Sequence, residues 1–255
     1  VYYSKTYVAG TDPGPPLAGE PVDHAGVLAE FQVSATDPNV ADPGSERRLM
    51  VFTEPQSNHN GGQLEFGPDG YLYVATGDAR QKPNPSQDLT SLGGKILRIT
   101  SSGEPAPGNP FGTRVYSYGH RNVQGLAWDA AGNLWASELG ENDVDELNLI
   151  TPGANYGWPV CEGNHIFNGT DPCPAQYAAP KLTFATDEAS PSGLAFAGGS
   201  LWMAALRGQR LYRISLNGLE ATESGQFFYG TWGRLRTVQT TPAGNLWLTT
   251  SNRDG

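Results

Sequence analysis

One pattern recurs four times along this chain: an apolar strand, a polar turn containing Gly, then a second apolar strand. The copies read GQLEFGPDGYLYVATGD from Gly62, QGLAWDAAGNLWASELG from Gln124, SGLAFAGGSLWMAALRG from Ser192 and RTVQTTPAGNLWLTTSN from Arg236. Alternating Leu, Trp, Tyr and Val positions mark half-buried strands, and Asp-Gly, Gly-Asn or Gly-Gly supplies the positive φ angles of a tight hairpin turn. Each copy is therefore predicted to be a β-hairpin.

The spacing of these hairpins predicts the architecture. They follow one another at intervals of about 45 to 67 residues, as four-stranded propeller blades do once two further strands and a loop are added. KILRIT, DELNLI and RLYRIS, which begin at Lys95, Asp145 and Arg210, supply the next strand in three blades. The 33 Gly and 20 Pro favour short strands and turns over helices. We predict a single all-β propeller domain of four-stranded antiparallel blades with no long helix.

The charge balance excludes two classes of partner. Sixteen Lys and Arg against 26 Asp and Glu give a net charge of −10, which repels phosphate backbones and anionic lipid headgroups. We therefore expect no nucleic-acid partner. No stretch approaches the ~18 consecutive apolar residues of a membrane-spanning helix, so no membrane span is expected.

The two cysteines, Cys161 and Cys173, bracket a loop that contains Gly, Asn and Pro. Two unpaired thiols are one interpretation of the pair, and a zinc site with His165 is another, although one histidine cannot complete zinc coordination. A short disulfide clip is the prediction we favour. It implies an oxidising compartment and hence a secreted or periplasmic protein.

The first candidate site is the run SNHNGGQL, which places His59 just before a predicted inner strand. Asp78 stands at the far end of the same hairpin, so the return of the strand can bring its carboxylate beside the imidazole. Such a carboxylate fixes the tautomer and raises the basicity of the ring. Taken alone, His59 is more typical of a loop or packing histidine, and only the residues around it favour a catalytic role.

The second candidate group is basic. The run YGHRNVQGL places Arg121 before another inner strand, where loops of a propeller line the central funnel, and its planar fork suits a carboxylate or ketone oxygen. Arg207 follows the strand LWMAAL, and Arg234 and Arg236 share a strand face by their spacing. Together these arginines would make an anion site on the axis. An inter-blade salt bridge for Arg121 and ordinary surface positions for the others remain open.

The third group is the acidic segment ELGENDVDEL, which carries five carboxylates within nine residues, from Glu138 to Glu146. Such carboxylates repel one another unless a cation or solvent screens them, and a hard ion with oxygen ligands, calcium above all, would do so. The spacing is not that of an EF-hand. A solvated acidic loop is the alternative.

Together these motifs resemble the soluble PQQ-dependent glucose and aldose sugar dehydrogenases, where PQQ is pyrroloquinoline quinone. The resemblance rests on NHNGGQL with GPDGYLYVATGD, on YSYGHRNVQGLAWD and on DELNLITPGANYGWP, in that order. It extends over essentially the whole chain. It implies a six-bladed propeller, of which residues 1–255 would cover roughly four blades, truncated at both ends relative to the family.

The resemblance also implies catalytic roles. His59 would remove the proton from the anomeric hydroxyl of an aldose while a hydride passes to PQQ, giving a lactone and a reduced cofactor that an electron acceptor reoxidises. Asp78 would orient His59, and Arg121 and Asn122 would contact the reactive quinone oxygens. Arg207, Arg234 and Arg236 would hold the carboxylates of PQQ, with Arg207 standing where the family often has Lys.

Two calcium roles follow from the same resemblance. The backbone carbonyls of Gly140 and Glu141 would hold an ion that also binds PQQ and acts as a Lewis acid. Many relatives have Pro where this chain has Glu141, and the added carboxylate is expected to alter cofactor affinity. Asp145, Glu146 and Tyr156 would form a second, structural calcium site.

Two other functions compete with the dehydrogenase. A non-catalytic propeller that binds a protein or sugar ligand, as in the hedgehog-interacting branch of the family, would have lost the His or Arg pattern and gained cysteines. A calcium-dependent lactonase would need carboxylates on several blades around the axis. The His, the arginines and the single acidic segment of this chain favour a sugar-oxidising enzyme.

Overall fold

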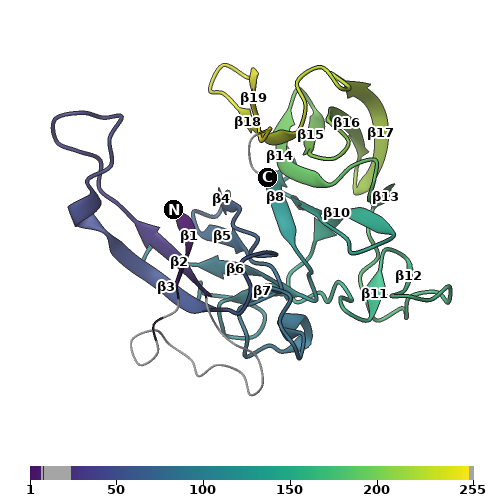
Figure 1. The fold of residues 1–255 in the computed structure, drawn as a ribbon, viewed down its shortest axis with the longest axis horizontal. Helices are drawn as coiled ribbons and strands as arrows, with labels where there is room; N and C mark the ends of the chain where they lie inside the picture. Colours follow the sequence, from purple (N-terminus) through teal and green to yellow (C-terminus); the bar gives the residue numbers. More distant parts are fainter. Residues whose placement is uncertain (7, 9–23, 253–255) are drawn as a thin grey trace.

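The computed structural model describes residues 1–6, 8 and 24–252, and Figure 1 shows them as a series of small sheets. Within these residues the only helices are two three-residue 3-10 turns, η1 (Pro43–Ser45) and η2 (Pro85–Gln87). None is long and apolar enough to cross a membrane. The prediction of an all-β chain without a long helix is confirmed.

Three of the sheets have four antiparallel strands, and each begins with a predicted hairpin. The first has the order β4-β5-β6-β7, the second β8-β9-β10-β13 and the third β14-β15-β16-β17. Their bounds are β4 (Leu64–Phe66), β5 (Leu72–Ala75), β6 (Lys95–Ile99), β7 (Val115–Tyr118), β8 (Val123–Trp128), β9 (Leu134–Glu138), β10 (Val144–Ile150), β13 (Leu182–Ala185), β14 (Pro191–Ala197), β15 (Ser200–Ala205), β16 (Arg210–Asn217) and β17 (Glu220–Phe227). The strands predicted from KILRIT, DELNLI and RLYRIS are β6, β10 and β16.

The remaining sheets are smaller. A three-stranded sheet of order β1-β2-β3 comes first in the chain, the fourth predicted hairpin forms the two-stranded sheet β18-β19, and a second two-stranded sheet, β11-β12, lies in the loop closed by the cysteines. Their bounds are β1 (Tyr2–Thr6), β2 (His24–Glu30), β3 (Arg47–Glu54), β11 (Cys161–Glu162), β12 (His165–Ile166), β18 (Leu235–Thr240) and β19 (Leu246–Thr250).

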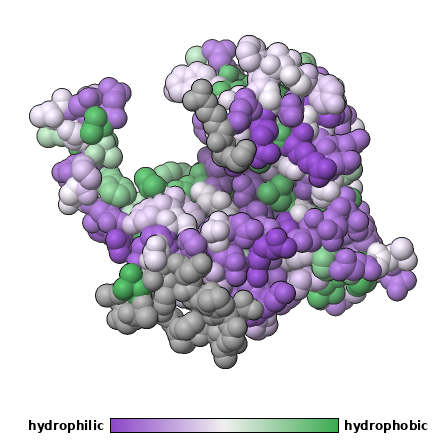
Figure 2. Space-filling view, in the orientation of Figure 1, coloured by the Kyte–Doolittle hydropathy of each residue, from purple (hydrophilic) through white to green (hydrophobic). Residues whose placement is uncertain are grey.

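The sheets follow one another in chain order along an open arc (Figure 1). The first strands of successive sheets, β4, β8, β14 and β18, are neighbours on the inner side of this arc. Polar side chains cover most of the outer surface seen in Figure 2, with small apolar areas between them. The innermost strands therefore bring the residues that precede them in sequence toward a common axis.

The hydrophobic core is divided among the spaces between successive sheets. Leu28 and Phe52 of the first sheet pack with Leu97 of the second. Trp135 of the β8 sheet, fully buried, packs with Met203 of the β14 sheet. Each of the three four-stranded sheets packs against a neighbouring sheet on both of its faces, and this face-to-face packing fixes the inner strand ends relative to one another.

Candidate functional site

His59 and Asp78 lie together at one end of the β4–β5 hairpin, as the sequence predicted. His59 Nδ1 lies 3.0 Å from Asp78 Oδ1, although 19 residues separate them. The hairpin brings them together because the chain runs out along β4 and returns along β5. The main chain also links them, since the Ala79 N–H donates to the His59 carbonyl at 3.0 Å.

The close approach of these two segments depends on Gly77. A Cβ at this position would lie 1.7 Å from the His59 carbonyl oxygen, which is impossible for any other residue without movement of the backbone. His59, Ala79 and Arg80 all have positive φ angles of 48° to 56°, a conformation that side chains rarely adopt. Non-glycine residues in this conformation persist where surrounding structure holds them.

Asp78 is buried and its carboxylate accepts four hydrogen bonds. Oδ1 faces His59 Nδ1 and accepts from the Arg80 N–H at 2.9 Å, while Oδ2 accepts from Asn84 Nδ2 and Trp158 Nε1, each at 2.8 Å. Burial alone would raise the pKa of Asp78, but the hydrogen bonds from His59, Arg80 and Trp158 and the electrostatic attraction of the His59 ring hold this pKa below its usual value. Asp78 is therefore an anion that orients His59.

Arg121 contacts Nε2, the other ring nitrogen of His59. Its Nη2 lies 3.2 Å from His59 Nε2, and its Nη1 donates to the Leu139 carbonyl at 3.0 Å. A guanidinium has only donors, so Nε2 must be the acceptor and the ring proton must sit on Nδ1, facing Asp78. The pair fixes His59 in the neutral tautomer whose Nε2 can take up a proton.

The guanidinium of Arg121 is buried, and its Nε has no hydrogen-bond partner within the described residues. It lies over the Trp158 ring, with 5.4 Å between Arg121 Cζ and the ring centroid. An unpaired buried donor is costly, so this side chain fits an additional oxygen acceptor. The arrangement suits the quinone contact predicted for Arg121.

Asn122 holds the loop after His59. Its Oδ1 accepts from the Gly61 N–H at 3.1 Å and from Gln124 Nε2 at 2.9 Å, and its main chain forms a β-bridge with Gly77. The residue thus ties the β8 sheet to the β4 sheet beside the histidine. A contact from Asn122 to a quinone remains a prediction.

A cavity of about 220 Å³ opens beside His59. Asp78, Glu141, Trp158 and Phe167 are among the residues that line it. The rings of Trp158 and Phe167 meet edge to face, with centroids 4.7 Å apart. Aromatic walls beside a few polar groups are typical of small-molecule sites.

Glu141 lines this cavity and bridges two arginines. Its Oε2 pairs with Arg121 Nη2, and its Oε1 lies 3.2 Å from Arg80 Nη2. The carboxylate thus contacts the same guanidinium that faces His59. The added carboxylate that distinguishes this position from Pro is therefore next to the predicted cofactor contact.

The side chains of Asp145 and Glu146 are held by main-chain donors in the predicted calcium segment. Asp145 accepts from the Gly140 and Ser190 N–H groups at 3.0 and 2.7 Å. Burial raises the pKa of Asp145 to about 6, and burial together with the charge of Glu138 raises that of Glu146 to about 8. Buried carboxylates of this kind are stabilised by a nearby cation.

Tyr156 contributes differently from the two carboxylates. Its hydroxyl donates to the Leu149 carbonyl at 2.6 Å and accepts from the Thr151 N–H at 2.9 Å. The hydroxyl is thus fully used within the protein. A calcium ligand from Tyr156 would therefore be its main-chain carbonyl.

Glu162 is an acidic residue of this region that the sequence reasoning missed. Its Oε1 faces four successive N–H groups, from Glu141 at 2.7 Å to Val144 at 3.4 Å. Its Oε2 is buried with no hydrogen-bond partner in the described residues. An orphaned carboxylate oxygen among other buried carboxylates fits a calcium ion by the chemistry of its donors.

The carboxylates do not by themselves complete a metal site. In residues 1–6, 8 and 24–252, no three His, Cys, Asp or Glu side chains form a group that could hold a metal ion. Main-chain carbonyls, as predicted for Gly140 and Glu141, would therefore have to supply part of the coordination. The calcium assignments remain predictions.

The three remaining arginines are not all brought to one place. Arg236 lines a cavity of about 160 Å³ with Gly61, Gln124 and Ser192, at the inner strand ends near the axis. Arg207 is exposed in the turn after β15, and Arg234 is half-buried just before β18. Of these three arginines, only Arg236 lines this axial cavity. It does so with Gly61 and Gln124, which lie two residues after His59 and Asn122.

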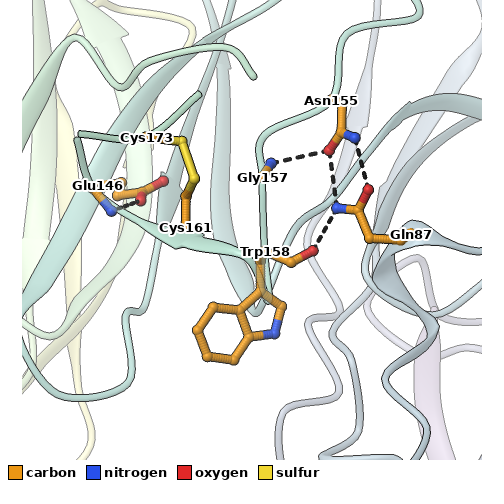
Figure 3. The surroundings of a disulfide bond; sticks show 8 residues. Gln87, Glu146, Asn155, Gly157, Trp158, Cys161 and Cys173 are labelled. Carbon is orange, nitrogen blue, oxygen red and sulfur yellow. Dashed lines mark hydrogen bonds between the residues drawn. A yellow bond between two sulfur atoms is a disulfide. The ribbon is translucent and has the colours of Figure 1, made fainter. Parts of the chain in front are cut away.

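The predicted disulfide is confirmed, because Cys161 and Cys173 are bonded. Figure 3 shows the disulfide on one side of Trp158 and, on the other side, Gln87, whose Nε2 donates to the Trp158 carbonyl. Sequence reasoning missed Trp158 and Asn84 as partners of Asp78. Trp158 lies in the GANYGWP motif, which was the only signal for it, whereas Asn84 lay in an unremarkable Pro-rich loop.

Comparison with known proteins identifies the relatives of this chain. The sequence model described as Glucose / Sorbosone dehydrogenase matches residues 27–255. The aldose sugar dehydrogenase YliI of Escherichia coli (strain K12) is 35% identical over 218 residues, which cover 78% of this chain and 58% of that protein. The chain thus spans somewhat more than half the length of this curated relative.

Two solved structures share the fold. The PQQ-bound aldose sugar dehydrogenase of Streptomyces coelicolor is 45% identical with a TM-score of 0.79, over 100% of this chain and 70% of that chain. The apo-form of the soluble aldose sugar dehydrogenase of Escherichia coli is 28% identical with a TM-score of 0.80, over 97% of this chain and 74% of that chain. These neighbours are β-propellers, so the predicted propeller fold is confirmed.

Proposed function

The chain belongs to the glucose/sorbosone dehydrogenase family, and we propose that it carries the catalytic base of a PQQ-dependent enzyme that oxidises the anomeric hydroxyl of aldose sugars to lactones. The observation that carries this proposal is the chain of contacts from Asp78 through His59 to Arg121, with the Nε2 of His59 as an acceptor. The PQQ-bound relative and the sugar dehydrogenases among the matches support it.

In this proposal His59 withdraws the proton of the sugar hydroxyl through Nε2. The Arg121 guanidinium now faces this nitrogen, so an entering hydroxyl must displace that contact. Asp78 keeps the proton of the ring on Nδ1 and stabilises the imidazolium that forms. The rings of Trp158 and Phe167 give the sugar an apolar wall. Bound PQQ would supply the hydride acceptor.

Arg121 and Asn122 would contact the quinone, and Arg236, with Arg207 and Arg234, would balance the carboxylates of the cofactor. The unpaired Nε of Arg121 supports a further oxygen acceptor at this place. A calcium ion held by the carbonyls of Gly140 and Glu141 would act as a Lewis acid there. A structural calcium ion would use Asp145, Glu146 and Tyr156, to which we add Glu162.

The disulfide between Cys161 and Cys173 supports a secreted or periplasmic location, since such bonds persist in oxidising compartments. The partners proposed are accordingly a small aldose and an electron acceptor of that compartment.

The test is the His59→Ala variant of the full-length protein, loaded with PQQ and calcium. We expect PQQ and calcium binding to persist and turnover of aldoses to fall by about 10²–10⁴-fold, the usual effect of losing a general base. His165→Ala is the matched control, because His165 also pairs with an aspartate, Asp143, but is more exposed and lies outside the cavity. Equal turnover in both variants and the wild type would refute the assignment. A wild type that binds sugar without oxidising it would indicate the non-catalytic alternative.

A further inference from the structure

Lys95, the first residue of β6, is fully buried. Its Nζ donates to three main-chain carbonyls: that of Pro85 at 2.9 Å, that of Ser86 at 3.1 Å and that of Gly93 at 2.6 Å. An ammonium group has three hydrogens and no acceptor, so these carbonyls use its full bonding capacity. Lys95 thus serves as an internal cation in a cage of oxygens, as a bound metal ion would.

The cage closes a loop onto the sheet. Pro85 and Ser86 lie near the middle of the connection between β5 and β6, and Gly93 lies near its end, just before Lys95. Burial lowers the pKa of Lys95 to about 7, although the negative charge of Asp88 acts in the opposite direction and raises it. A buried charge is retained only where its bonds offset the lost hydration, so the three carbonyls are what keep this ammonium in place.

The closed loop carries side chains that reach the proposed catalytic pair. Asn84 Nδ2 donates to Asp78 Oδ2 at 2.8 Å, and Asn84 Oδ1 accepts from the Ser86 N–H at 2.9 Å. Asn84 therefore links the cage directly to the carboxylate that orients His59. One residue separates Asn84 from Ser86, so a shift of the cage must move Asn84 as well.

The same loop also contacts Trp158, the second donor to Asp78 Oδ2. Gln87 Nε2 donates to the Trp158 carbonyl at 2.6 Å, and Gln87 Oε1 accepts from Asn155 Nδ2 at 2.7 Å (Figure 3). Trp158 Nε1 then donates to Asp78 Oδ2. Both donors to Asp78 Oδ2 thus depend on the segment 84–87, which Lys95 holds.

We propose that Lys95 is a positioning residue of the active site: its buried ammonium fixes the loop 84–93, and the loop sets Asp78, and through it His59, by way of Asn84 and Trp158. The inference rests on the proposed function only where turnover is the readout, because the geometry of His59 can be observed without substrate or cofactor.

The first experiment compares Lys95→Met with wild type in the full-length protein. Methionine keeps the length and bulk of the side chain and removes the charge. We expect the imidazole ¹⁵N resonances of His59 in the cofactor-free protein to shift, and kcat of the loaded enzyme to fall by about 10²-fold with little change in KM, as for a misplaced catalytic group. Lys181→Met is the matched control, since Lys181 pairs with Glu220 on the surface and should change neither readout.

A double-mutant cycle distinguishes positioning from general stabilisation. Asn84→Ala cuts the link to Asp78 and also removes the acceptor of the Ser86 N–H, but it leaves Lys95 and the three carbonyls of the cage unchanged in chemistry. If Lys95 acts through Asn84, Lys95→Met in the Asn84→Ala background should lower kcat by much less than it does alone. Fully additive losses would overturn the proposal, as would wild-type His59 resonances and kcat in Lys95→Met.

Should Lys95→Met fail to fold, Lys95→Ala refolded with propylammonium decides the matter. This ion has the three carbons and the ammonium that the truncation removes. Recovery of the His59 resonances with propylammonium, and not with propanol, supports the proposal, and no recovery overturns it. A wild-type protein without sugar oxidation would refute the proposed function instead, and would leave the His59 resonances as the test of Lys95.

Discussion

The carboxylate of Asp78 cannot be replaced by an amide without loss, because both of its oxygens accept two hydrogen bonds. In Asp78→Asn the NH₂ group must face one pair of donors, either His59 and Arg80 or Asn84 and Trp158. Two buried donors then lose an acceptor at about 1–3 kcal/mol each. We expect the free energy of unfolding to fall by about 2–6 kcal/mol.

The catalytic loss follows from the tautomer. If the NH₂ group faces His59, the ring must accept at Nδ1 and carry its proton on Nε2, where the base is needed. We expect kcat to fall by about 10- to 10²-fold, less than for His59→Ala because the imidazole remains. Asp129→Asn is the matched control. Asp129 also accepts a hydrogen bond from a tryptophan, since Trp135 Nε1 donates to its Oδ2 at 3.0 Å, but it lies in a turn 70 residues along the chain from His59.

Denaturant titration and steady-state kinetics of the two variants provide the assay. The pKa of Asp78 is held below its usual value, so its contribution to stability is present above that usual value and is lost as the pH falls through the lowered one. In Asp78→Asn this part of the acid sensitivity should disappear. If Asp78→Asn kept wild-type kcat, or lost less than about 1 kcal/mol of stability, the reasoning from its four donors would be wrong.

Two further perturbations test other buried acids. Burial raises the pKa of Glu54 to about 7. The contribution of Glu54 to the free energy of unfolding is therefore fully present below its ordinary pKa near 4.5, and it falls by about 3 kcal/mol as the pH rises through 7. Glu54→Gln should remove this pH dependence, and thermal melts with the same pH dependence in both proteins would contradict the prediction. Chelation should lower the melting temperature of wild type but not of a variant combining Asp145→Asn with Glu146→Gln; a wild type unchanged after metal removal, verified by elemental analysis, would exclude a structural calcium ion.

Local turn chemistry made most of the fold predictable. The hairpins at β4–β5, β8–β9, β14–β15 and β18–β19 each carry a Gly-containing turn between alternating apolar residues, and all four form. The pairing of β2 with β3 was missed because a long connection, from Phe31 to Glu46, replaces a tight turn. A register set by packing rather than by a turn leaves no short-range signal.

The site was predictable to the extent that it lies within one hairpin. His59 and Asp78 meet because β4 and β5 return on one another, and Arg121 joins them from the start of the next blade. The indole of Trp158 reaches Asp78 across 80 residues, and no spacing in the sequence indicates it. The burial of Lys95 was equally invisible, because a lysine in an alternating strand normally faces solvent.

The positive φ angles of His59, Ala79 and Arg80 explain why the site needs these remote contacts. Each costs on the order of 1–2 kcal/mol for a residue with a side chain, so the hairpin end would relax if nothing held it. The bonds from Asn84 and Trp158 to Asp78, and from Asp78 to the Arg80 N–H, hold it in place. Because these bonds hold the strained backbone, His59 stays at the wall of the cavity. A site whose base is held by hydrogen bonds from the loops around Asn84 and Trp158 should lose turnover before it loses its fold when those bonds are cut.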